Sequence, residues 1–116
     1  MERDLRNLTI VLGMTLAGVL ALMAQPAKQS QAGDAAKGKS VFAAQCLVCH
    51  SADSTAKKLG PGLKGLFKRA KLENGKSLTE ESVRAFIDNG SSGMPEFKEM
   101  LSAADKNNLI AYLKTL

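Results

Sequence analysis

Cys46-Leu47-Val48-Cys49-His50 is the stretch of sequence that decides the fold. The pattern C-x-x-C-H is typical of a site where a c-type haem is attached covalently. Each thiol can form a thioether with a haem vinyl group, and the adjacent histidine can bind the iron. These five residues hold both cysteines and the single histidine of the 116-residue sequence. No ligands of these types therefore remain for a second site.

Three other kinds of site contain a C-x-x-C pair. A thioredoxin-like dithiol is normally found beside a βαβ pattern, and the sequence shows none. A structural zinc site needs a second pair of Cys or His ligands, which the sequence does not supply. A plain disulfide would close a very small ring and would leave the position of His50 unexplained, as would a core histidine. Haem attachment is therefore the favoured interpretation.

The N-terminal part of the chain has the pattern of a targeting segment. Leu8 to Ala24 is uncharged and mostly apolar, and Arg3 and Arg6 precede it. The run is long for the apolar part of a signal peptide and at the short limit for a membrane span. We expect residues 1–24 to be a signal peptide or membrane anchor, with the cleaved signal favoured, and residues 25–33 to be a linker or cleavage zone. The remainder is then periplasmic or otherwise exported, and tied to the inner membrane only if the segment stays uncleaved.

Residues 34–116 form one small domain in this interpretation. The domain is too short to build a large core from side chains alone. The whole sequence has only four Phe, one Tyr and no Trp. A buried haem would supply much of the missing apolar volume, so the cofactor is also expected to be the structural centre.

Helical periodicity dominates this domain, and no strand pattern is convincing. We expect a first helix from a cap at Asp34 to about Gln45, with Gly38, Phe42 and Cys46 on one face. A glycine and proline break then follows, and residues 63–70 have the spacing of a short amphipathic segment.

Two further helices are expected in the second half. Thr79 predicts the N-cap of one helix, with Val83, Phe86 and Ile87 inward and a stop at Asn89-Gly90. Ser102 predicts the cap of the last helix, with Leu109, Tyr112, Leu113 and Leu116 as its apolar stripe. The predicted fold class is all-α, with three main helices and loops around a prosthetic group.

Two methionines of the domain could bind the iron opposite His50. Met94 lies in a Gly-Met-Pro loop, and Pro95 restricts it to extended geometry. Met100 lies just before a helix among apolar neighbours and is expected to fill the core. A thioether sulfur would make the iron six-coordinate and suited to electron transfer. Met94 is therefore the predicted second ligand.

Together these motifs resemble class I cytochrome c, the small monohaem electron carriers, and most closely its short bacterial members. The resemblance covers about residues 33–116. Besides the pentapeptide, the matching residues are Gly38, Phe42, Gly60-Pro61-Gly62-Leu63, Gly93-Met94-Pro95-Glu96-Phe97, Leu109 and Tyr112. The chain differs from some relatives in having no Trp and no obvious Tyr for the haem propionates.

The resemblance implies one covalent haem c, with thioethers at Cys46 and Cys49 and with His50 and Met94 as the iron ligands. The Pro61 carbonyl would accept the Nδ1–H of His50 and fix the ring. The first and last helices would cross at Gly38. The residues that the resemblance implies would line the haem are Leu63, Phe97 and Leu66.

The function that follows is one-electron transport between redox partners, without catalytic residues. An alternative is a haem enzyme of the peroxidase kind, or a haem subunit of a larger oxidoreductase. Peroxidase chemistry needs an open site on the iron, and no second histidine could serve there as acid and base. A gas- or redox-sensing module is a further alternative, weakened by the absence of an attached signalling domain.

A basic segment suggests the kind of partner. Seven Lys and Arg lie between Lys57 and Lys76, against Glu73 as the single acid. The segment is either an ordinary solvated face or a docking patch that steers an acidic redox protein to the haem edge. Nucleic acid is not an expected partner, because aromatic residues are not interleaved with the basic ones apart from Phe67.

Overall fold

The computed structural model describes residues 32–116, so the predicted targeting segment lies outside the described residues. The helices are α1 (Ala35–Gln45), the short 3-10 helix η1 (Leu66–Lys68), α2 (Glu80–Asn89) and α3 (Ala103–Leu113). Within residues 32–116 there is no named strand; isolated bridges pair Lys71 with Ser77 and Ser91 with Met94. The all-α prediction with three main helices is confirmed.

Each predicted cap begins its helix. The Asp34 carboxylate accepts from two backbone N–H groups of the first turn of α1, at 2.8 and 3.1 Å. Thr79 and Ser82 form a reciprocal capping box on α2, with bonds of 3.0 and 2.9 Å. The Ser102 hydroxyl accepts from the Asp105 N–H at 3.0 Å. Side-chain oxygens thus satisfy donors that the first helical turn leaves unpaired.

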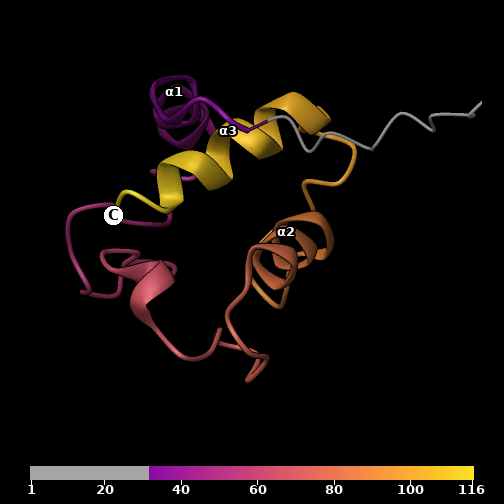
Figure 1. Cartoon of the computed structure of the whole chain (residues 1–116). Coiled ribbons are helices and arrows are strands. Elements are labelled where there is room, and N and C mark those ends of the chain that lie inside the picture. The colour runs from indigo at the N-terminus through magenta and orange to yellow at the C-terminus, as the bar shows by residue number, and fades with distance from the viewer. Residues whose placement is uncertain (1–31) are drawn as a thin grey trace, which may run out of the picture.

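Helices α1 and α3 cross in close contact (Figure 1). Gly38 is buried at the crossing, where an added Cβ would collide with the backbone carbonyl of Asn108. Beside it, the rings of Phe42 and Tyr112 lie 5.5 Å apart between centroids. Only glycine permits this approach of the two backbones. Helix α3 also packs against α2 and so joins the two halves of the domain.

The core draws on all three helices and on the loops. Ile110, 1 % exposed, belongs to it although the predicted stripe of the last helix omitted it. The buried apolar residues are Phe42, Leu66, Val83, Ile87, Phe97, Leu101, Leu109, Ile110 and Leu113.

Met100 is not a core residue, and that prediction was wrong. Its side chain is 58 % exposed. The Phe97 carbonyl accepts the N–H groups of both Met100 and Leu101, at 3.2 and 3.1 Å. In this turn Phe97 and Leu101 are buried, which leaves Met100 in solvent.

The segment between α1 and α2 is mostly loop. Of the predicted amphipathic residues 63–70, only Leu66–Lys68 are helical, and Gly65 before them has a φ of 67°. The Arg69 guanidinium donates to the carbonyls of Gly62 and Lys64, at 2.7 and 2.9 Å. Those two carbonyls are therefore satisfied without a longer helix. Among residues 32–116, no helix has the length and apolar character needed to cross a membrane.

Candidate haem site

The end of α1 positions the C-x-x-C-H motif. Cys46 is the C-cap residue, and its N–H donates to the Phe42 carbonyl at 2.8 Å. The Cys46 carbonyl in turn accepts from the N–H groups of Cys49 and His50, at 3.1 and 2.9 Å. These turns bring the three chemically active side chains onto the wall of one cavity of about 280 Å³, the motif cavity.

Both thiols are free and half-buried. Burial, with a smaller contribution from Cys49, raises the pKa of the Cys46 thiol to about 11, so this sulfur is protonated at neutral pH. Within residues 32–116, no group of three or more His, Cys, Asp or Glu side chains is arranged to hold a metal ion. The described part of the chain therefore offers no zinc site around the motif.

The His50 ring is held from one side. Its Nδ1 lies 2.8 Å from the Pro61 carbonyl oxygen, which can only accept, so Nδ1 is the donor. In the neutral tautomer with its proton on Nδ1, Nε2 carries the lone pair that can bind a metal. Gly60 lies against the same ring, and a Cβ there would be 2.5 Å from His50 Cε1.

Met94 lies on the wall of the same motif cavity. Two backbone bonds of 3.0 Å each join Ser91 and Met94 in a tight turn. Gly90, just before this turn, and Gly93, within it, have positive φ of 62° and 89°, which glycine adopts readily. The methionine is partly buried against the core, whereas Met100 is exposed. Of the two candidate sulfurs, only Met94 is among the cavity-lining residues.

A second cavity of about 310 Å³ adjoins the first and is mostly apolar. Pro61, Glu73, Phe86 and Met94 line both cavities, so the two spaces meet at these residues. Leu63 and Leu66 line the second cavity, and Phe97 lines the first.

The chemistry of these walls fits a haem. Two thiols, an imidazole with a free nitrogen and a thioether surround a space whose remaining walls are largely aliphatic and aromatic. All seven predicted site residues line this pair of cavities. Phe86, on both cavities, was predicted only as an inward residue of α2; its helical spacing pointed to burial but not to the cofactor.

Comparisons with known proteins place the chain in a family. Residues 33–113 match the family model described as cytochrome C oxidase, cbb3-type, subunit III. Cytochrome c2 of Blastochloris viridis is 40 % identical over 114 residues, covering 83 % of this chain and 86 % of that protein. Cytochrome c6 of a Picosynechococcus species is 38 % identical over 85 residues, covering 71 % and 73 %.

A solved structure agrees with these sequence matches. Cytochrome c6 from the diatom Phaeodactylum tricornutum superimposes with a TM-score of 0.57 at 28 % identity, covering 72 % of this chain and 93 % of that one. The chain therefore belongs to the class I cytochrome c family, whose small members carry single electrons on one covalent haem c and are not enzymes.

Proposed function

We propose that Cys46 and Cys49 would be the thioether attachment points of the haem, and that His50 and Met94 would be the two protein ligands of its iron. The observation that carries this proposal is that all four side chains line one cavity. The haem, when bound, supplies the one-electron couple. The residues of the chain attach it, orient it and keep solvent from it.

Each ligand has its own task in this proposal. The Pro61 carbonyl holds His50 in one tautomer and one orientation, since it lies 2.8 Å from Nδ1. The Met94 sulfur is uncharged, and methionine ligation raises the reduction potential relative to anionic ligands. With both sides of the iron occupied, no position remains for peroxide or dioxygen. This closure favours a carrier over a peroxidase.

We further propose that partners dock beside the motif. Val48 and Leu59 are 75 % and 76 % exposed; Leu59 lines the motif cavity, and Val48 lies between the two cysteines in sequence. Lys58 adjoins them, and its ammonium donates to the Leu47 carbonyl at 3.0 Å. Exposed apolar side chains bordered by lysines suit brief contact with a redox protein that has an acidic surface.

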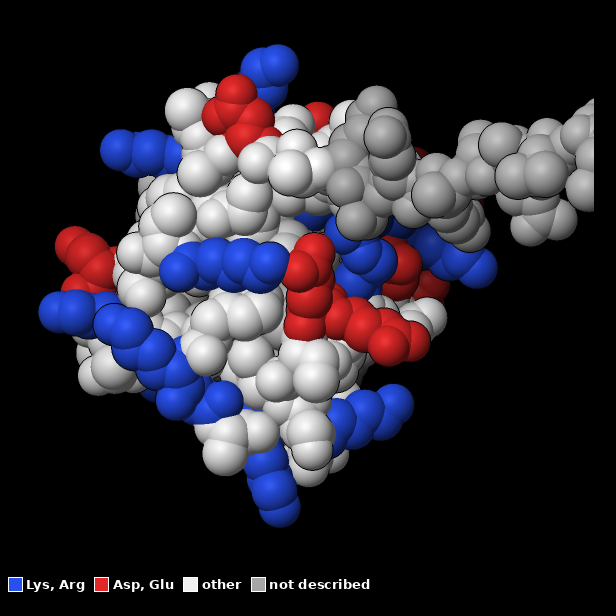
Figure 2. All heavy atoms as spheres, in the orientation of Figure 1, with Lys and Arg blue, Asp and Glu red and all other residues white. Residues whose placement is uncertain are grey.

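The charge distribution supports an acidic partner. In Figure 2 the lowest part of the face, over the segment that leads into α2 in Figure 1, shows Lys and Arg without acidic neighbours. The exposed basic side chains of this segment are Lys57, Lys58, Lys64, Lys68, Lys71 and Lys76. Such a surface speeds encounter with a negatively charged protein at low ionic strength.

The chain is proposed to act after export, with the apolar N-terminal run removed as a signal peptide. The carrier proposal is consistent with this, because a diffusing protein reaches several partners. The intact mass of the native protein tests it: a mass that lacks residues 1–24 supports cleavage, and a full-length mass contradicts it.

A redox titration of the purified holoprotein tests the carrier function. We expect one reversible one-electron step, with no binding of carbon monoxide to the reduced protein at neutral pH. Met94→Ala is the comparison, because it opens one side of the iron. If the wild-type protein binds carbon monoxide and turns over peroxide as readily as Met94→Ala, the carrier proposal fails.

A further inference from the structure

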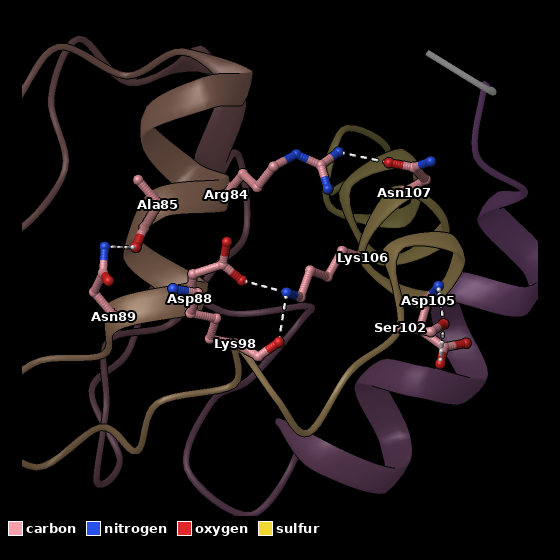
Figure 3. Close-up of polar contacts among 9 residues, drawn as sticks. All are labelled: Arg84, Ala85, Asp88, Asn89, Lys98, Ser102, Asp105, Lys106 and Asn107. Carbon is pink, nitrogen blue, oxygen red and sulfur yellow. Dashed lines mark hydrogen bonds and ion pairs between the residues drawn. The ribbon is translucent and has the colours of Figure 1, made fainter. Parts of the chain in front are cut away.

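Lys106 is a buried cation in the described part of the chain. It lies on α3 and is 9 % exposed. Figure 3 shows its ammonium between Asp88 of α2 and Lys98. Burial of an ammonium is costly unless the group is paired and hydrogen-bonded, so its partners define its role.

The ammonium joins two places outside α3, one on α2 and one in the segment just before α3. Its Nζ lies 2.6 Å from Asp88 Oδ1 on α2 and donates to the Lys98 carbonyl at 2.9 Å. Asp88 Oδ1 is itself buried and has no hydrogen-bond partner apart from this ion pair. Removal of Lys106 would therefore leave the buried Oδ1 of Asp88, whose side chain is 25 % exposed, and the Lys98 carbonyl without this partner.

Both places lie at the base of the Met94 loop, residues 90–98. Asp88 stands in the last turn of α2, just before the loop begins, and Lys98 ends it. The returning segment of the loop also bonds to α2: the Phe97 N–H donates to the backbone carbonyl of Ile87 and the Lys98 N–H to that of Asp88, at 3.0 and 3.2 Å. Lys106 therefore closes the base of the loop from the α3 side.

We propose that Lys106 is a positioning residue that holds Met94 in place for the iron. This inference rests on the proposed ligation by Met94. Without the ammonium, the base of the loop opens more often and the sulfur is displaced more easily. In this proposal the conformation of the Met94 loop depends on a contact from α3, although Met94 does not belong to α3.

The chain contains a matched control for this ion pair. Lys114, the C-cap residue of α3, also binds an acid of α2, with its ammonium 2.5 Å from Glu80 Oε2. Both side chains are about half exposed, and Glu80 begins α2 rather than ending it. Loss of Lys114 removes an ion pair between the same helices without affecting the base of the loop.

Imidazole binding to the oxidised holoprotein tests the proposal, because imidazole must displace Met94. Visible absorption gives both the sulfur–iron band and the imidazole affinity. We expect Lys106→Met to raise the affinity about tenfold, as loss of a charged hydrogen bond would. Lys114→Met and the core variant Ile110→Val, which lowers global stability, should change it less than about twofold.

The outcomes separate the two proposals. If wild type shows no sulfur–iron band, Met94 ligation fails, and the role of Lys106 with it. If the band is present and Lys106→Met changes the affinity no more than Ile110→Val, only the role of Lys106 is overturned. Should Lys106→Met fail to fold, Asp88→Asn decides: about a threefold rise supports the proposal, and an unchanged affinity overturns it.

Discussion

The two sides of the proposed iron site are built in different ways. On the His50 side, the attachment residues and the histidine occupy five consecutive positions, and Pro61 follows eleven residues later. On the Met94 side, the ligand stands in a loop whose base is fixed by α2 and by Lys106 of α3. One side is thus local in sequence, and the other depends on the assembled fold.

This difference indicates which of the two proposed iron ligands is displaced first. The His50 side is expected to persist as long as the thioethers do, because they keep the ligand at the iron even when the fold loosens. The Met94 side requires α2, α3 and the loop to be in place together. We expect exogenous ligands and mild denaturants to act on the Met94 side first.

The largest expected effect comes from breaking the local side at its covalent anchor. The double variant Cys46→Ser, Cys49→Ser leaves no thiol in the sequence. We expect the intact mass of the variant to lack haem after acid–acetone extraction, whereas the wild-type polypeptide keeps the mass of one haem. Covalent haem on the double variant would contradict the assignment of both cysteines.

A substitution at Gly60 tests how tightly the histidine is held. A Cβ at Gly60 would lie 2.5 Å from His50 Cε1, so in Gly60→Ala either the ring or the backbone at residue 60 must shift. Overpacking of this kind costs about 1–3 kcal/mol of folding free energy. Chemical unfolding of the reduced holoprotein measures it.

Gly75→Ala is the control for Gly60→Ala. Gly75 has a φ of 80°, and an added Cβ would have nothing within 4 Å. Its substitution introduces backbone strain of about 1 kcal/mol but no collision. A Gly60→Ala variant that is no less stable than Gly75→Ala would show that the His50 ring has room to move.

A smaller effect is expected at the surface beside the local side. Reversal of two charges in Lys57→Glu, Lys58→Glu should slow reduction by an acidic redox protein about tenfold at low salt, and much less at high salt. The matched control is Lys37→Glu, Lys39→Glu, two exposed lysines on α1. Equal slowing by both pairs would mean that net charge, rather than this surface, steers the encounter.

The sequence predicted the local parts of the molecule well. The helix caps at Asp34, Thr79 and Ser102 were found because each depends on one side chain and the next few backbone N–H groups. The crossing at Gly38 followed from the family resemblance. The covalent cofactor followed from five adjacent residues.

The features that the sequence did not predict depend on tertiary contacts, which hydrophobic periodicity does not indicate. Met100 has apolar neighbours in sequence, yet its turn directs it to solvent. Lysine is a residue type typical of the surface, so the sequence does not indicate that Lys106 is buried. Its burial results from packing against α2 and the base of the Met94 loop. Residues 63–70 have helical spacing, but Gly65 and the Arg69 bonds leave only one 3-10 turn.

The central claim is that Met94 completes the site that His50 begins, and one set of spectra tests it most directly. The oxidised and reduced visible spectra of the holoprotein should be recorded for wild type, Met94→Ala and, as the control, Met100→Ala. Wild type and Met100→Ala are predicted to be low-spin with a sulfur–iron band, and Met94→Ala is predicted to lose the band and bind carbon monoxide. Retention of the band in Met94→Ala, or its loss in Met100→Ala, would contradict the account.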